Sequence, residues 1–194
     1  MISSETIKQL REQTGAAIID CKKVLDQTQG DIVKAIEVLR KQGQKVVEKK
    51  SGRAMKEGLI GSYVHNNNKI AALVEVNCET DFVARNEEFK TLVHDLAMQV
   101  VAASPKYLAP EEIPAEVITK EKEIYREQLL KEGKPENMFD KIISGKLQKY
   151  YQEVCFLNQP FVKDDKIIIG DLVKQTIAKL GENIKVSRFV IFNL

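Results

Sequence analysis

The fold is organised around one stretch, Val74-Glu75-Val76-Asn77-Cys78-Glu79-Thr80-Asp81-Phe82-Val83-Ala84-Arg85-Asn86. Its first residues predict a strand that breaks at Asn77, and an amphipathic helix is expected from about Asn86. Between them, the turn Thr80-Asp81-Phe82-Val83 places a carboxylate beside an aromatic ring. Two interpretations are open. The turn could close the core, with Thr80 or Asp81 bonded to the backbone, or it could be an exposed tip that contacts another molecule.

The segments around this stretch predict a sheet. Residues 58–64 and 69–76 are rich in apolar side chains and predict two strands, and the Asn-rich turn between them favours a β-hairpin. Residues 184–192 are rich in β-branched and aromatic side chains and predict a third strand. Asn86 can cap the next helix, which has a continuous apolar stripe and should end before Ser104-Pro105. The sequence therefore predicts an α+β fold, with a roughly three-stranded antiparallel sheet covered by helices.

Residues 1–43 predict three short helices. Ser3 or Ser4 can cap the first helix, which Gly15 ends. Gly30 can end the second helix and Asp31 can cap the third, which Gly43 is expected to end. Three helices of this size bury few apolar side chains, so we expect this bundle to pack against another part of the chain.

Residues 44–57 are predominantly basic and predict a partly helical linker. The lysines could form a solvated face or contact an acidic surface of a partner. We expect a domain boundary within this linker. The predicted domains are residues 1–53, an N-terminal three-helix domain, and residues 54–194, an α+β core.

The C-terminal half predicts mainly helices. Residues 114–131 and 135–154 are expected to form a helical hairpin that lies against the sheet, joined by Glu132-Gly133-Lys134. Residues 156–162 should be extended or irregular. Asp171 can cap a last helix, which Gly181 ends.

Composition excludes several classes of protein. The net charge of +2 on 194 residues is too small to indicate a nucleic-acid-binding protein. No apolar run reaches the roughly 18 residues that a membrane-spanning helix requires. The first residues enter helical sequence at once, so we expect neither a signal peptide nor a transit segment. Its three cysteines are widely spaced and indicate buried thiols in a reducing compartment.

The sequence contains no recognisable catalytic constellation. His65 and His94 lack partners at the spacing of metal ligands, so we expect no metal site. Glycine-rich loops that bind phosphate groups are absent, so we expect no nucleotide cofactor. An enzyme whose residues meet only in the folded structure stays open as an alternative, but no catalytic residue is predicted.

The organising stretch also carries a family resemblance. From Leu73 to Asn86 it resembles the signature of the elongation factor Ts family. Further blocks resemble that family in the same order along the chain: Thr14-Gly15-Ala16, residues 20–25, 30–32, 39–43, 157–164, 184–186 and 188–190. The resemblance therefore covers essentially the whole chain.

The resemblance implies a guanine-nucleotide exchange factor for elongation factor Tu, the GTPase that delivers aminoacyl-tRNA, with no active site of its own. It also implies that the N-terminal domain resembles a ubiquitin-associated domain. Members of the family insert an Asp-Phe tip near the Mg²⁺ site of the GTPase. Asp81 and Phe82 would form this tip here, with Thr80 and Val83 shaping it. Phe82 should then be more exposed than a core phenylalanine.

The resemblance assigns a second contact with the GTPase to Arg11, Ile18, Ile19 and Lys50. Many members have methionines where Ile18 and Ile19 stand, and isoleucine is the stiffer side chain. Alternatively, one of the two isoleucines could lie in the core of the bundle.

At its length the chain resembles the short form of the family, for which a homodimer is plausible. We expect no direct contact with nucleic acid or membrane. The expected location is the bacterial cytoplasm, or the stroma if the protein is encoded in a plastid. A different functional class also stays open: a small helical binding module that recognises ubiquitin-like or nascent-chain partners.

Overall fold

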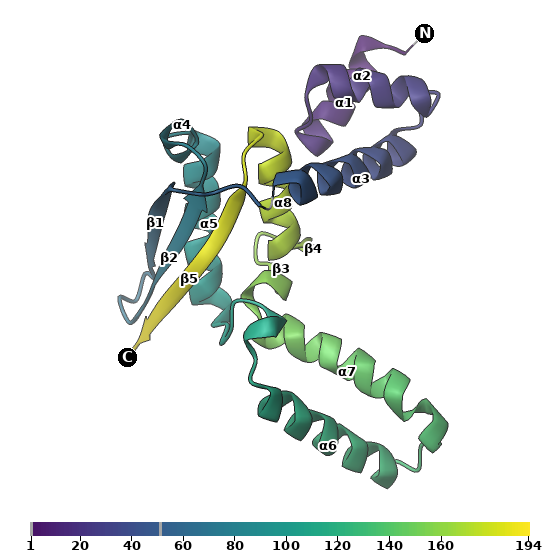
Figure 1. Ribbon diagram of the computed structural model, residues 1–194, viewed down its shortest axis with the longest axis vertical. Coiled ribbons are helices and arrows are strands. Elements are labelled where there is room, and N and C mark those ends of the chain that lie inside the picture. The colour runs from purple at the N-terminus through teal and green to yellow at the C-terminus, as the bar shows by residue number, and fades with distance from the viewer. Residues whose placement is uncertain (1, 51) are drawn as a thin grey trace. The chain divides into compact units, whose positions relative to one another are not determined.

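The computed structural model describes residues 2–50 and 52–194, with the side chains of residues 40 and 44–50 outside the description. The predicted contact residue Lys50 and much of the basic linker therefore lie outside the described side chains. The elements are α1 (Ser4–Thr14), α2 (Ile18–Gln27), α3 (Ile32–Lys50), β1 (Glu57–Val64), β2 (Ile70–Cys78), α4 (Asp81–Ala84), α5 (Glu87–Ala103), η1 (Pro110–Glu112), α6 (Ala115–Lys131), η2 (Glu136–Met138), α7 (Phe139–Val154), η3 (Phe156–Asn158), β3 (Pro160–Phe161), β4 (Asp164–Ile168), α8 (Ile169–Leu180) and β5 (Ile184–Asn193) (Figure 1).

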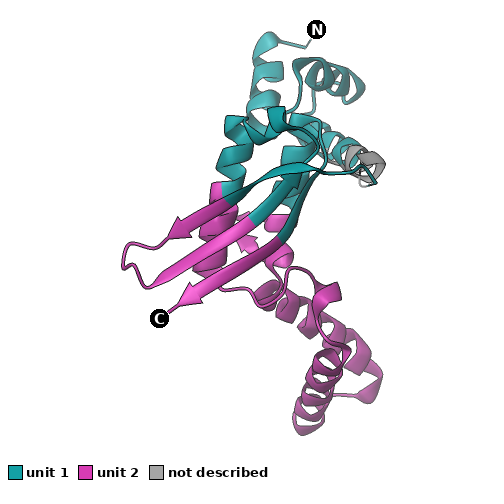
Figure 2. Cartoon of the chain, turned by 60° about the vertical axis from the view of Figure 1, so that its left-hand side comes forward, with its two compact units in different colours: residues 1–60, 75–93, 171–187 teal, residues 61–74, 94–170, 188–194 magenta. Residues whose placement is uncertain are grey.

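The chain forms two compact units (Figure 2). The first comprises residues 1–60, 75–93 and 171–187, and the second residues 61–74, 94–170 and 188–194. The main sheet has the strand order β1-β2-β5 and is antiparallel. Where β5 reaches the C-terminus, the backbone N–H of Leu194 donates a hydrogen bond of 3.0 Å to the carbonyl oxygen of Lys69, just before β2. The predicted α+β class is confirmed.

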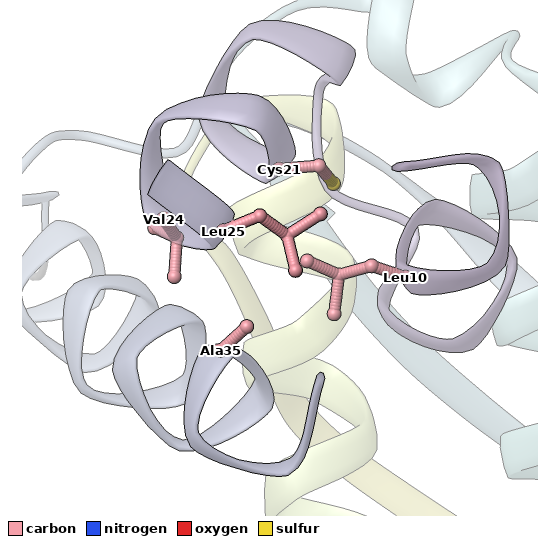
Figure 3. Packing of buried hydrophobic residues seen from close by; sticks show 5 residues of the cluster. All are labelled: Leu10, Cys21, Val24, Leu25 and Ala35. Carbon is pink, nitrogen blue, oxygen red and sulfur yellow. The ribbon is translucent and has the colours of Figure 1, made fainter. Parts of the chain in front are cut away.

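The first three helices share one small core (Figure 3). Five fully buried side chains meet in it: Leu10, Cys21, Val24, Leu25 and Ala35. The predicted caps are confirmed. The Ser3 hydroxyl accepts from the Thr6 N–H at 3.1 Å, and the Asp31 carboxylate accepts from the Lys34 N–H at 3.1 Å. Gly15 ends α1 with a positive φ of 65°, which glycine adopts without steric strain.

The third helix does not end at Gly43, as its sequence predicts, but continues to Lys50. A side chain at Gly43 would place its Cβ atom 3.6 Å from the Cβ atom of Ala178 in α8. Gly43 is therefore a position where α3 approaches α8 rather than a helix stop. The expectation that the bundle packs against another part of the chain is met at this contact, within the first unit.

The strand β2 and the helix α5 form the centre of the core. The inward side chains of β2 are fully buried at Val74, Val76 and Cys78. Figures 1 and 2 show α5 running along one face of the sheet, and the predicted apolar stripe of α5 is buried: Phe89, Leu92, Val93, Leu96, Ala97, Val100 and Val101. The side chain of Asn86 caps α5, accepting from the Glu88 N–H at 2.8 Å.

Two predicted boundaries near the core are wrong. The strand β2 does not break at Asn77 but continues to Cys78, since the Asn77 side chain accepts a hydrogen bond from the Ser187 hydroxyl on β5. The last helix begins at Ile169 rather than at Asp171, because the buried Ile169 donates its N–H to the Gln159 carbonyl at 3.0 Å. The short antiparallel pair β3–β4 is not predicted by the sequence pattern.

The helical hairpin is confirmed, but it does not lie against the sheet. In Figures 1 and 2, α6 and α7 extend away from the strand segments of the second unit. The reason is the small apolar surface of the two helices. Leu129 is the buried residue of α6, and α7 buries Phe139, Leu147 and Val154. These side chains suffice for the two helices to pack on each other but leave no continuous face for a sheet. The predicted domain boundary at residue 53 stays a prediction.

Candidate functional site

The turn Thr80-Asp81-Phe82-Val83 folds as the start of a single helical turn, α4. Thr80 is its N-cap: the hydroxyl oxygen accepts from the Val83 N–H at 3.4 Å. The turn closes with hydrogen bonds from the Arg85 N–H to the Asp81 carbonyl and from the Asn86 N–H to the Val83 carbonyl, each 3.0 Å long. The sequence expectation of a plain turn is thus refined to a short capped helix.

The helical turn sends neighbouring side chains in opposite directions. Phe82 is 81% exposed, whereas Val83 and Ala84 are 9% and 7% exposed. The expectation that Phe82 is more exposed than a core phenylalanine is confirmed. Val83 packs in the core, as the packing interpretation predicts. That interpretation therefore describes Val83, and the exposed-tip interpretation describes Phe82. A large, exposed aromatic ring loses contact with water only when another surface covers it.

Asp81 lies beside Phe82 and forms an ion pair with Arg85, whose Nη2 is 3.1 Å from Asp81 Oδ2. The side chains are 45% and 79% exposed. An ion pair with this exposure contributes little to stability and opens easily. The carboxylate of Asp81 is therefore available to another molecule that contacts the tip.

The base of the tip is held by two carboxylates from different parts of the first unit. Glu182 accepts two hydrogen bonds from Thr80, one from the N–H at 3.0 Å and one from the hydroxyl at 2.6 Å. Glu79 accepts from the Asn183 N–H at 2.7 Å and from Arg53 Nη1 at 3.3 Å. Sequence reasoning did not single out Glu79 or Glu182, because their partners are far away in the sequence and no local motif connects them.

The three-helix bundle presents a second exposed surface. Arg11 is exposed, and Ile18 and Ile19 are 54% and 79% exposed. The alternative that one isoleucine lies in the bundle core is wrong, because Cys21, Val24 and Leu25 occupy the inner face of α2. Val33, which the sequence analysis did not single out, is also exposed on this bundle, at 70%. The side chain of Lys50 lies outside the description.

Other candidate chemistry is limited. In the described part of the chain, no three His, Cys, Asp or Glu side chains gather as a metal site would require. Likewise, no described helix is long and apolar enough to cross a membrane. A cavity of about 400 Å³ in the second unit is lined in part by Gln99 and Gln159. Their side-chain amides bond to each other and to the backbone, so this cavity presents no orphaned polar group of theirs to a ligand.

Burial raises the pKa of the thiol at the base of the tip, Cys78. The pKa of Cys78 is raised to about 11, first by burial and then by the nearby negative charge of Glu182. The thiol donates a hydrogen bond to the Thr80 carbonyl, with the sulfur 3.2 Å from the oxygen. Cys78 is therefore a neutral structural donor at the base of the tip rather than a reactive group.

The model of the family described as Elongation factor TS matches residues 2–194. The chain belongs to the elongation factor Ts family. The match covers both compact units and includes the tip and the exposed surface of the bundle.

Individual elongation factor Ts proteins match over most of their length. Elongation factor Ts of Thermosipho melanesiensis is 55% identical over 194 residues, which are 100% of this chain and 99% of the relative. The protein from Fervidobacterium nodosum is 56% identical over 189 residues, 97% of this chain and 96% of the relative. That from Carboxydothermus hydrogenoformans is 50% identical over 194 residues, 100% of this chain and 89% of the relative.

Proposed function

We propose that this chain promotes GDP release from elongation factor Tu by inserting the tip residues Asp81 and Phe82 beside the Mg²⁺ site of that GTPase. Elongation factor Ts proteins are nucleotide exchange factors for elongation factor Tu. The observation that carries the finer proposal is the exposure of Phe82, 81%, on a helical turn whose base is fixed by hydrogen bonds.

The physical chemistry of Mg²⁺ supports this mechanism. Mg²⁺ requires near-ideal octahedral oxygen geometry, so a small displacement of its surroundings weakens the hold on the nucleotide phosphates. Burying an aromatic ring in a partner's pocket supplies binding free energy that can drive such a displacement. The exposed carboxylate of Asp81 adds a negative charge close to the ion. Under this proposal the chain needs no catalytic residue or cofactor of its own.

A second contact with the GTPase is proposed for the three-helix domain, residues 1–53. The exposure of Arg11, Ile18 and Ile19 supports it, because apolar side chains on a small bundle gain most when a partner covers them. Lys50 stays a prediction. Both surfaces would then contribute affinity, and the tip alone would act on the nucleotide site.

We also propose that two copies associate through the exposed face of the sheet in the second unit. Four apolar side chains of its strands are exposed: Val64, Leu73, Val190 and Phe192, with Phe192 at 63%. Leu73 lies between Ala72 and Val74, which are buried, so strand alternation places Leu73 on the open face of β2. Residues 54–194 would serve as both core and dimerisation domain. The proposed location is the bacterial cytoplasm, because the relatives come from bacteria, or a plastid stroma.

Release of labelled GDP from elongation factor Tu tests the proposal directly. The intact protein should accelerate release, and Phe82→Ala should lower the maximal acceleration by about tenfold or more, the loss expected of an interface hot spot. Ile19→Ala should instead raise the concentration needed for half-maximal acceleration. Leu130→Ala, an exposed apolar side chain on α6, is the control and should change neither quantity more than about twofold. No acceleration by the intact protein would overturn the function, and unchanged acceleration with Phe82→Ala would overturn the tip mechanism.

A further inference from the structure

We propose that Glu182 is a positioning residue for exchange: its carboxylate fixes Thr80, and through Thr80 it holds α4 in the form that presents Asp81 and Phe82. This inference rests on the exchange function proposed above. Glu182 lies in the turn between α8 and β5, where Gly181 has a positive φ of 76° that lets the chain leave the helix. It belongs to neither the tip nor the bundle surface.

The contact between Glu182 and Thr80 is bidentate. One carboxylate oxygen accepts from the backbone N–H of Thr80 at 3.0 Å, and the other accepts from its hydroxyl at 2.6 Å. Hydrogen bonds to an ionised carboxylate are shorter and stronger than bonds between neutral groups. Both the backbone and the side chain of the same residue are therefore fixed by a single carboxylate.

Glu182 also determines how Thr80 caps α4. Because the hydroxyl proton points to Glu182, the lone pairs of the oxygen remain for the Val83 N–H, which lies 3.4 Å away. A helix of four residues has no stability of its own in water, so its cap and its tertiary contacts decide whether it forms. Loss of the carboxylate would leave the hydroxyl free to rotate and would weaken this cap.

Glu79 completes the arrangement with a reciprocal contact. Its carboxylate accepts from the Asn183 N–H at 2.7 Å. Glu79 and Thr80 of one turn are therefore bonded to Asn183 and Glu182 of the other. The thiol of Cys78 donates to the Thr80 carbonyl as well. The N–H, the hydroxyl and the carbonyl of Thr80 are thus all engaged, while Phe82, two residues later, is exposed. This contrast is typical of a rigid support beneath a contact residue.

The expected effect of releasing the support follows from populations. If α4 is formed in only a fraction of molecules, the apparent affinity for the GTPase is the full affinity multiplied by that fraction, whereas the rate at saturation is unchanged. A purely structural role for Glu182 would lower stability throughout the first unit without this selective effect. The two roles are therefore distinguishable.

The test uses the full chain with Glu182→Ala and Glu182→Gln. Glu88→Gln is the matched control, because Glu88 forms a 2.6 Å ion pair between α5 and Lys179 of α8 without contacting Thr80. Three quantities are measured: the concentration for half-maximal GDP release, the maximal release rate, and hydrogen–deuterium exchange of the amides of Val83 and Arg85 in the free protein.

Glu182→Ala should raise the half-maximal concentration about tenfold, as a fall of the formed fraction to about one tenth requires, and leave the maximal rate within about twofold. Exchange of the two amides should approach the rate of an unprotected amide, because α4 is then open in most molecules. Glu182→Gln should lie between Glu182→Ala and the intact protein, because a neutral amide can still bond to Thr80 but lacks the charge. It also serves if Glu182→Ala does not fold. Glu88→Gln should match the intact protein.

Half-maximal concentrations and amide exchange equal to those of the intact protein would overturn the positioning role. A loss shared equally by Glu88→Gln would also overturn it. If the intact protein does not accelerate GDP release while Glu182→Ala still speeds exchange of the two amides, the proposed function fails and the support of α4 by Glu182 stands.

Discussion

Phe82 and Val83 show how one helical turn divides two tasks between adjacent residues. A rotation of about 100° per residue separates their side chains, so Phe82 faces solvent and Val83 faces the core. Substitutions at these two positions should therefore affect different properties. Under the proposed function, changes at Phe82 should affect GDP release from the GTPase, whereas changes at Val83 should affect the stability of the fold.

Some of the site could be predicted at the level of residues. The order of strand, turn and helix located Asp81 and Phe82, and Asn86 was a recognisable cap. The support from Glu182 could not be predicted, since 102 positions separate it from Thr80 and hydrogen bonds across such distances leave no periodic signal. The alternative of a buried isoleucine at position 18 or 19 was wrong, because a helix of 10 residues has inner positions for only some of its apolar side chains.

The buried thiols predict a loss of stability in alkaline solution. Burial raises the pKa of Cys78 and of Cys155 from about 9 to about 11. Both thiols ionise more readily when the chain is unfolded, so stability is complete below pH 9 and falls between pH 9 and 11. The loss should be about 2 kcal/mol for each thiol.

Urea denaturation at pH 8 and at pH 10.5 measures this loss, both in the intact protein and in the Cys78→Ala/Cys155→Ala variant. The variant should lose distinctly less stability between the two values of pH. Comparing the two proteins removes the contribution of lysines, which titrate in the same range. Equal losses in both proteins would contradict the prediction.

At the level of elements, two glycines in regular structure should respond in opposite ways to the same substitution. A Cβ atom at Gly58 in β1 would lie 2.3 Å from the carbonyl oxygen of Val76, so Gly58→Ala must force β1 away from β2. We expect a loss of about 1–3 kcal/mol in the free energy of unfolding. Gly145 in α7 has no atom within 4 Å of such a Cβ. Gly145→Ala should therefore stabilise the protein by about 0.5–1 kcal/mol.

Urea unfolding of the two variants and the intact protein, at an unchanged dependence on denaturant, gives both differences. Gly145→Ala is the control for the loss of glycine flexibility in the unfolded chain, which the two variants share. A Gly58→Ala variant as stable as the intact protein would show that β1 can move away from β2 without cost.

Elements were predicted where the signal is local. The caps Ser3, Asp31 and Asn86 and the stripe of α5 depend on neighbours within four residues, and each is confirmed. The end of α3 was predicted wrongly because the role of Gly43 depends on Ala178 in another helix. The pair β3–β4 was missed for a related reason: two short strands carry too few residues for alternation to be visible.

For the whole molecule, the α+β class followed from the two periodicities in the sequence, while the direction of the helical hairpin did not. The sequence predicted a hairpin that lies against the sheet, and only the small number of buried side chains shows that neither helix covers it. How an element packs depends on the surface of its neighbour, which the element's own sequence does not contain.

The proposed association of two copies through the sheet predicts the mass of the protein in solution. Sedimentation equilibrium at micromolar concentrations should give twice the chain mass of 22.0 kDa for the intact protein. Phe192→Ser should shift the mass toward a single chain, because this ring is the largest and most exposed of the four apolar side chains that a second copy would cover. Phe82→Ser, an equally large loss at an exposed ring outside this face, should leave the mass unchanged. A single-chain mass for the intact protein would overturn the homodimer.

The buried Gln99 has a consequence for the solubility of the chain. Its side-chain amide donates to the Pro160 carbonyl at 3.1 Å and accepts from the Val162 N–H at 2.9 Å, which is the pattern of a neighbouring β-strand. One side chain thus occupies the open edge of the short strand β3. Unoccupied strand edges are templates on which other chains add. We therefore expect Gln99 to protect the chain against aggregation. An apolar residue of similar size at this position would fill the same space but leave the Pro160 carbonyl and the Val162 N–H open to another molecule.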